Sequence, residues 1–371
     1  MSSPEPGPRH TGLIQGLESL QNLTRAFLQW LSELCQVLRL DRVVQHLGWL
    51  RFDASEISQL PLRKRVLLQS GFILGCITTL LHLALKDRIG ILAPLYYLFS
   101  PALMAVGFGS LGYMLKRLGL AHTARQHFYL AGVAAMALVF GFGSFRLPST
   151  EAIDTGKRET VRVMVWNMFR GNLGRGRAIH GVQKLEPDVA AIFDPVPLDE
   201  ELKLWGKKLP KYRLIRIGKE AILVTRGRPK YLKVREITPG VTLATCQLRS
   251  KKSTFYVSVV VFSVNPFRSR SETFEKLAEI WEKLDPRIPH VVLGAFNIPR
   301  SSAYFKRMTL RNAYEVGGRG FGLTWPMPLP LYDPEQIWVN NSWKVISCKT
   351  YFTTRSDHTP LVATLQSKQR R

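Results

Sequence analysis

The chain has 371 residues, and 46% of them are hydrophobic, so the composition excludes a disordered protein and allows one large domain plus further segments. Its 52 Lys and Arg residues against 27 Asp and Glu residues give a formal net charge of +25. This charge favours anionic partners such as nucleic acid, phosphorylated small molecules or acidic lipid, although a basic surface can equally serve solubility or general attraction to a membrane. The cysteines, Cys35, Cys76, Cys246 and Cys348, lack zinc-ligand spacing, and the sequence leaves open whether Cys246 and Cys348 form a disulfide.

The N-terminal region, residues 1–62, contains an amphipathic helical pattern. Large apolar side chains recur at spacings of three and four between residues 13 and 38. Such a helix can lie on a membrane surface, bind a protein partner through residues 13–38, or pack its apolar face on the rest of the chain.

Three consecutive apolar stretches follow, at residues 66–85, 91–115 and 128–145. Each approaches the length that a helix needs to cross a hydrocarbon layer about 30 Å thick, so the pattern predicts three transmembrane helices. Buried core helices are the alternative, but short charged links between the stretches favour the membrane. Pro94 and Pro101 predict that the second helix is kinked or begins late.

The flanking charges predict an orientation. Basic residues stand at positions 63–65 before the first span and again between positions 116 and 125, which places the N-terminus and the second link in the cytoplasm. We therefore expect an integral membrane protein that crosses the membrane three times within residues 63–146. A polar linker at residues 147–160 would then lead to an extracytoplasmic domain, whereas a two-span arrangement would reverse this orientation.

From residue 161 to residue 371 the sequence changes to short strand patterns with few helices between them. Strands are expected at residues 162–167, 189–193, 221–225, 242–248, 255–264, 290–296, 336–339 and 361–365, and helices at residues 177–185, 271–284 and 302–310. This order predicts an α/β (α+β) four-layer sandwich in which two mixed β-sheets pack face to face and helices flank them.

Six short motifs in this region carry a family resemblance. In chain order they are RVMVWNMFRGN, EPDVAAIFD, VVLGAFNIP, GRGFGLTWP, EQIWV and SDHTPLVATL. Their order and spacing, over about 205 residues from Val161 to Leu365, resemble the endonuclease/exonuclease/phosphatase superfamily, whose fold is that of deoxyribonuclease I. The chain looks most similar to the bacterial branch with membrane helices ahead of this domain. That likeness implies a place in the bacterial cytoplasmic membrane.

The resemblance implies a divalent cation, Mg²⁺ or Mn²⁺, that carboxylate and amide oxygens hold against the scissile phosphate. Asn167, Asp194 and Asp357 match the metal-proximal positions of the family. Asp194 replaces a glutamate and is one methylene shorter, so the ion would have to shift. Because Pro195 follows, Asp194 could instead cap a helix whose first residue is Pro195.

The resemblance also implies the catalytic positions. His358 would stabilise the pentavalent phosphorus, Glu335 would orient His358, and Asn167 and Asn297 would line the same cleft. Residues 356–358 could alternatively form only a turn.

Two catalytic positions are lost. Ala295 stands where the family has the carboxylate that aligns the attacking water, and Ser263 stands near the position of a central-strand histidine. Residues 291–311 contain no Asp or Glu that could replace the carboxylate. Loss of such a group typically lowers the rate by about 10²- to 10⁴-fold.

These departures lead to two main hypotheses. The first is a membrane-anchored pseudoenzyme, without a metal cofactor, whose cleft binds an anionic ligand such as a lipid head group, a nucleic acid or a small phosphoester. Basic neighbours such as Arg170 and Arg300 would assist that binding. The alternative is an active phosphodiesterase or nuclease that uses Mg²⁺ or Mn²⁺ in an altered site. A purely structural membrane protein is a third possibility.

Overall fold

The computed structural model describes residues 86–88, 93–136, 145–146, 160–168, 177–195, 198–249, 254–263 and 270–368, and the single positions 61, 75, 78, 82 and 265. The chain forms two compact units. The helical unit consists of residues 1–80 and 103–135, and the sandwich unit consists of residues 81–102 and 136–371. Residues 81–102, which lie in the predicted membrane region, thus group with the C-terminal domain.

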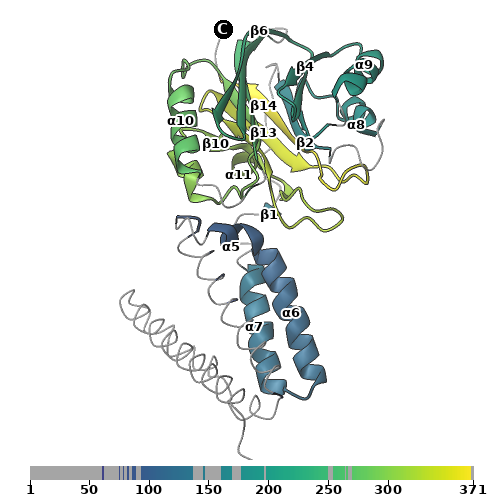
Figure 1. Cartoon of the computed structure of the whole chain (residues 1–371), viewed down its shortest axis with the longest axis vertical. Helices are drawn as coiled ribbons and strands as arrows, with labels where there is room; N and C mark the ends of the chain where they lie inside the picture. The colour runs from purple at the N-terminus through teal and green to yellow at the C-terminus, as the bar shows by residue number, and fades with distance from the viewer. Residues whose placement is uncertain are drawn as a thin grey trace, which may run out of the picture. The chain divides into compact units, whose positions relative to one another are not determined.

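In the helical unit, α6 (Pro101–Arg117) and α7 (Ala121–Met136) form a helical hairpin (Figure 1). The turn between them contains Gly119, whose φ of 79° lies in the left-handed region that glycine enters without strain. Gly112 allows the two helices to approach, because a Cβ atom there would lie 3.2 Å from the carbonyl oxygen of Ala124. Short side chains therefore set the spacing of the pair.

The predicted membrane spans differ from the helices that form. The stretch at residues 91–115 is not one helix, because α5 (Ala93–Leu98) ends before Pro101 starts α6. The predicted break at Pro101 is thereby confirmed. The α7 helix begins seven residues before the expected third span, and most of the first span and the pattern at residues 13–38 lie outside the described residues. Within the described part of the chain, no helix combines the length and the apolar character required to cross a bilayer.

The sandwich unit contains two six-stranded sheets. The first has the strand order β10 (Arg311–Asn312), β12 (Glu335–Val339), β9 (His290–Ala295), β8 (Thr254–Phe262), β7 (Val241–Arg249) and β6 (Arg228–Thr238). The second has the order β13 (Trp343–Thr350), β14 (Leu361–Ser367), β2 (Thr160–Asn167), β3 (Val189–Phe193), β5 (Ala221–Thr225) and β4 (Arg213–Ile217). The pairs β8–β9 and β2–β3 are parallel and the other pairs are antiparallel, so both sheets are mixed.

Alternating side chains of both sheets build the inner core, which includes Val163, Val165, Val259, Leu293 and Ile337. On the outer face of the first sheet lies α10 (Ser271–Glu282), which buries Phe274, Leu277 and Trp281. On the second sheet lie α8 (Arg177–Leu185) and α9 (Leu198–Lys208) (Figure 1). The predicted four-layer architecture of the C-terminal domain is confirmed.

Some local predictions were wrong or incomplete. A helix was expected at residues 302–310, but only a short 3₁₀ helix, η6 (Ala303–Arg307), forms because Met308 adopts an extended conformation. Strands β4, β6 and β13 and helix α9 were not predicted. The remaining elements are α11 (Ala313–Gly317) and the two-residue strands β1 (Phe145–Arg146) and β11 (Gly320–Phe321), which pair with each other.

Candidate functional site

Two adjacent parallel strands bring Asn167 and Asp194 together. Asn167 is the last residue of β2, and Asp194 directly follows β3. The Asn167 side-chain amide donates a hydrogen bond from Nδ2 to Oδ2 of Asp194 at 2.9 Å. Asp194 has a φ of 44°, a left-handed conformation that aspartate tolerates better than most residues. Because Pro195 is not helical, the alternative of a helix whose first residue is Pro195 is wrong.

Glu220 is an acid beside Asp194 that sequence reasoning missed. The antiparallel register pairs Phe193 with Ala221, so the residues just outside this pair, Asp194 and Glu220, are neighbours. The backbone N–H of Asp194 donates to the carbonyl oxygen of Glu220 at 2.9 Å. Partial burial, and then the charge of Asp194, raise the pKa of Glu220. Only knowledge of the β3–β5 pairing would have identified this residue.

His358 and Glu335 form the predicted carboxylate–histidine pair. Glu335, the first residue of β12, is fully buried, and its Oε1 lies 2.9 Å from His358 Nδ1. The imidazole and the carboxylate are not oriented as in a regular hydrogen bond, so we describe their contact as a close ion pair. The other carboxylate oxygen, Oε2, accepts a hydrogen bond from the Thr324 hydroxyl at 2.6 Å. Glu335 is therefore fixed from two sides.

The surroundings of His358 favour its charged form. Burial lowers its pKa, but the neighbouring carboxylate of Glu335, followed by those of Asp357 and Asp194, outweighs burial, and the net shift of the pKa is upward. The side chain is 9% exposed, so these charges act with little screening by water. A positively charged imidazolium is thus stabilised in the site.

A network of hydrogen bonds fixes the loop that carries His358. Ser356 Oγ donates to the carbonyl oxygen of Asn167 at 2.8 Å and accepts from the backbone N–H of His358 at 3.1 Å. Trp166 Nε1 donates to the carbonyl oxygen of His358 at 2.9 Å. Residues 356–358 are therefore both a structured turn and part of the site.

Asp357 lies on the other side of the imidazole. Its Oδ1 is 3.8 Å from His358 Nε2, and its Oδ2 accepts a hydrogen bond from Trp325 Nε1 at 2.9 Å. Trp325 thus positions a site carboxylate, a role that its place in the motif GRGFGLTWP does not reveal.

Ala295 and Asn297 occupy the end of β9. Ala295 is buried in the inner core and pairs directly with Glu335 across the antiparallel β9–β12 ladder. Asn297, with a φ of 52°, donates from Nδ2 to the carbonyl oxygen of Phe262 at 2.7 Å. This hydrogen bond of Asn297 therefore connects the end of β9 to the end of β8. The other predicted site residues gather in one cluster, which consists of Asn167, Asp194, Glu335, Asp357 and His358.

Ser263, at the end of β8, uses its backbone. Its N–H donates to the carbonyl oxygen of Gly240, and its own carbonyl oxygen accepts from Arg270. Arg270 also donates to the carbonyl oxygen of Phe296 at 3.0 Å, so this buried guanidinium holds the ends of β8 and β9 together. Sequence reasoning missed this residue.

The residues that the structure describes do not supply a complete set of ligands for Mg²⁺ or Mn²⁺. Such ions take about six oxygen ligands, usually with carboxylates among them. In the part of the chain that the structure describes, no group of three or more His, Cys, Asp or Glu residues is arranged to hold a metal ion. The carboxylate of Asp194 accepts a hydrogen bond from Asn167, and the carboxylate of Asp357 accepts one from Trp325. Ala295 contributes only a methyl group.

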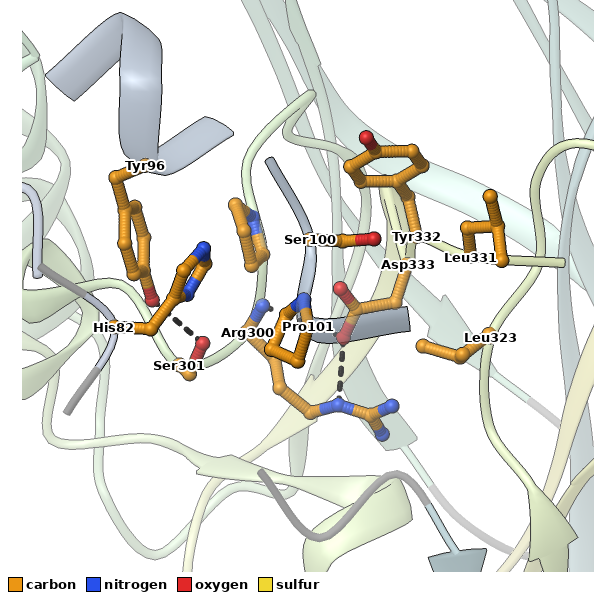
Figure 2. A pocket seen from close by; sticks show the side chains of 11 residues that line it. His82, Tyr96, Ser100, Pro101, Arg300, Ser301, Leu323, Leu331, Tyr332 and Asp333 are labelled. Carbon is orange, nitrogen blue, oxygen red and sulfur yellow. Dashed lines mark hydrogen bonds and ion pairs between the residues drawn. The ribbon is translucent and has the colours of Figure 1, made fainter. Parts of the chain in front are cut away.

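Arg300 is engaged inside the domain. Its Nε lies 2.6 Å from Oδ2 of Asp333, and both side chains are buried (Figure 2). Burial raises the pKa of Asp333 to about 6, against the effect of the Arg300 charge. The expected contribution of Arg300 to an anion-binding cleft is therefore offset by Asp333, and Arg170 lies outside the described residues.

The segment at residues 81–102 binds the loop that follows β9. Figure 2 shows Tyr96 hydrogen bonded to Ser301, at 2.7 Å, beside the Arg300–Asp333 pair. The fully buried carboxylate of Asp87 accepts hydrogen bonds from the hydroxyls of Tyr97 and Ser302 and from the backbone N–H of Ala303. Tyr96, Arg300 and Ser301 line a small cavity of about 30 Å³, which has room for about one water molecule.

Comparisons with known proteins bear on the fold of the C-terminal domain. No protein-family model matches the chain, and no curated protein matches its sequence. Among solved structures, an endonuclease/exonuclease/phosphatase from Bacteroides vulgatus matches with a TM-score of 0.50 and 16% identity, over 57% of this chain and 100% of that one. A mannosyl-6-phosphatase from Bacteroides thetaiotaomicron matches with a TM-score of 0.47 and 16% identity, over 55% and 99%.

At this level of identity, a structural match shows the fold and not the activity. The match extends over the whole of the Bacteroides vulgatus protein. It agrees with the two mixed sheets and the flanking helices. The C-terminal domain of this chain therefore has the deoxyribonuclease I-like fold of the endonuclease/exonuclease/phosphatase family.

Proposed function

We propose that this protein is a catalytically impaired member of the phosphoesterase fold whose site binds a phosphate-containing anion through His358. The observation that carries the proposal is the pairing of Ala295 with Glu335 across two strands. The position that would supply the water-aligning carboxylate holds a methyl group, while the partner of His358 is retained. The group that stabilises phosphate charge thus persists without the group that activates water.

The local charges suggest the kind of anion. One imidazolium, at His358, lies among the carboxylates of Asp194, Glu335 and Asp357. A dianionic phosphomonoester would be repelled by these carboxylates more strongly than a monoanionic phosphodiester. We therefore favour a phosphodiester ligand, which includes nucleic acid and lipid head groups. Titration with dimethyl phosphate and methyl phosphate would test this preference, and tighter binding of the monoester would contradict it.

The decisive experiment compares Ala295→Asp with the matched variant Ala295→Asn in the full chain. Directly opposed side chains on an antiparallel pair have Cβ atoms about 5 Å apart, so an aspartate at position 295 would face Glu335. We expect the two carboxylates to destabilise the fold and to create a site for Mg²⁺ or Mn²⁺. Added metal should raise the melting temperature of Ala295→Asp but not that of Ala295→Asn or the wild type.

Hydrolysis of bis(p-nitrophenyl) phosphate would be measured on the same three proteins. The proposal predicts no metal-dependent turnover in the wild type and measurable turnover in Ala295→Asp. Robust metal-dependent hydrolysis by the wild type, lost in His358→Ala, would contradict it. That outcome would establish the second candidate, an active metal-dependent phosphoesterase, which the intact His358–Glu335 pair and the Asn167–Asp194 contact favour.

We also propose that the protein is attached to a membrane. Large apolar side chains are exposed on α6 and α7, among them Val106, Tyr113, Met114, Tyr129 and Met136. Such a surface is typical of a membrane or protein contact. With 17 and 16 residues, these helices are about 25 Å long, slightly short of a full hydrocarbon crossing. Retention of the full chain in membranes after alkaline extraction would support attachment, and complete release would contradict it.

An extracytoplasmic domain at a bacterial cytoplasmic membrane completes the proposal. The positive-inside pattern places the link at residues 86–88 on the same side as the C-terminal domain. The buried contact of Asp87 with Ser302, within the sandwich unit, supports this arrangement. Protease added to intact spheroplasts should digest a C-terminal tag, and protection of the tag until lysis would contradict the orientation.

A further inference from the structure

A basic hollow lies on the outer face of the first sheet, away from the site around His358. It has a volume of about 270 Å³, and strands β6, β7 and β8 and helix α10 form its walls. Three cations line it, namely Lys233 and Arg235 of β6 and Lys283, which follows α10. None of the described residues that line it is acidic. We call this hollow the β6 groove.

Two tyrosines stand among these cations. Tyr231, on β6, is 78% exposed and has a φ of 55°, and the ladder with β7 shifts register between Lys230 and Lys233. A tyrosine in the left-handed region is uncommon, and this one coincides with the irregularity in the ladder and leaves its ring largely exposed at the groove. Tyr256, half-buried on β8, lines the groove from the sheet. Ile280 and Leu284 add an apolar wall.

The edge of β6 is poorly suited to pairing with a strand from another chain. The strand forms the end of its sheet, but it carries Pro229 and several charged side chains, and its ladder with β7 is interrupted twice. Proline, charge and bulges are the features that keep an edge strand from pairing with another chain. The groove is therefore better suited to a ligand that lies across the side chains.

The position of the groove also separates it from the candidate site and from residues 81–102. Arg270, next to the start of α10, contacts Phe296 and Tyr97, whereas Lys283 follows the other end of the helix. With twelve residues, α10 is about 18 Å long. The groove therefore lies at the far end of α10 from the contact of Arg270 with Tyr97.

We propose that the β6 groove binds a nucleoside phosphate, either as a free nucleotide or as part of a single-stranded nucleic acid. Cations that neutralise phosphates, together with aromatic rings that stack on bases, are the combination that single-stranded nucleic acid sites use. Lys233, Arg235 and Lys283 supply the charge, and Tyr231 and Tyr256 supply the rings. This site is separate from the function proposed for His358.

The test measures fluorescence anisotropy of a labelled oligothymidylate with the full chain, and competition by thymidine 5′-monophosphate. Lys233→Gln/Lys283→Gln should weaken oligonucleotide binding at least tenfold and lower the slope of log K against log salt by about 1.4, since each lost phosphate contact contributes about 0.7. The control Lys207→Gln/Lys344→Gln removes two exposed lysines from α9 and β13 and should have little effect.

Tyr231→Asn tests whether the Tyr231 ring stacks on a base. Asparagine suits this position because it tolerates a positive φ. Loss of one stacking contact should weaken binding by about 5- to 100-fold. Introduced into a His358→Ala background, the groove substitutions should cause the same fold-losses, so failure here and failure of the proposed function remain distinguishable. Competition by the mononucleotide identifies a free nucleotide as the ligand, and its absence identifies a strand. No binding of either probe, or equal losses in the groove and control variants, would overturn the proposal.

Discussion

The carboxylates around His358 raise its pKa, whereas burial alone would lower it and favour the neutral imidazole. Glu335→Gln keeps the size of the side chain at position 335 and removes its charge. We expect this change to lower the pKa of His358, and two-dimensional NMR of the histidine ring measures the shift directly. An unchanged pKa would mean that Glu335 does not set the charge.

The raised pKa of His358 predicts how the free energy of unfolding depends on pH. Since folding raises the pKa of His358, its contribution to stability is complete below the unfolded pKa of about 6.5. The contribution is lost as pH rises through the higher folded pKa. Denaturant unfolding across this range should show the loss in the wild type and a smaller loss in Glu335→Gln.

Asp333 is the other buried acid whose removal has a clear expected cost. Asp333→Ala leaves the buried guanidinium of Arg300 without its partner, which typically destabilises a protein by about 3–5 kcal/mol. Asp285→Ala, which removes an acid from the exposed ion pair with Arg287, should cost far less. Urea unfolding of both variants provides the comparison, and equal costs would contradict the assignment of a buried ion pair.

The sequence predicts site residues that belong to motifs, and it misses residues that depend on tertiary contacts. Asn167, Asp194, Asp357, Glu335 and His358 were identified from six ordered motifs, and the structure brings them together. Glu220 and Trp325 join the cluster through strand register and a loop contact. Neither relation leaves a local pattern, so composition and spacing could not reveal them.

At the scale of elements, the contact around Asp87 joins residues 81–102 to the sandwich. Asp87→Ala would leave three donors, from Tyr97, Ser302 and Ala303, without a charged acceptor. Because hydrogen bonds to charged groups contribute about 1.5–3 kcal/mol each and are not additive, we expect a loss of about 3 kcal/mol. Differential unfolding of the wild type, Asp87→Ala and the shape-matched Asp87→Asn measures it.

Two outcomes of that comparison are informative. A smaller loss in Asp87→Asn than in Asp87→Ala would show how much depends on the charge. Wild-type stability in both variants would mean that the segment does not support the domain. A chain that begins at residue 151 lacks the whole segment, so it should be less stable than the full chain by at least the Asp87→Ala difference.

Buried elements were predicted better than exposed ones. The bounds of β3, β5 and α8 match the expected ranges because each carries a strong apolar pattern. Strand β6 was missed because nearly all of its side chains are exposed and charged residues occupy both faces. Pairing with β7, and not the composition of β6, makes this segment a strand.

At the scale of the whole molecule, Cys246 and Cys348 lie on strands of opposite sheets and both thiols are free and buried. Burial raises the pKa of each to about 12, which removes the reactive thiolate near neutral pH. With Cys35 and Cys76 replaced by serine, Ellman's reagent should label neither thiol in the native protein. Both should react in denaturant. Rapid labelling under native conditions would contradict this packing, and no reaction in denaturant would indicate a disulfide.

The division of the sandwich unit into residues 81–102 and 136–371 has a consequence for biosynthesis. Ser302 lies 215 positions after Asp87, and at about 5–20 residues per second a ribosome needs roughly 10 to 40 seconds to cover that distance. Throughout that interval the Asp87 carboxylate has no partner from the later strands. The nascent chain must therefore keep this segment accessible until the end of β9 has emerged, and only then can the contact close.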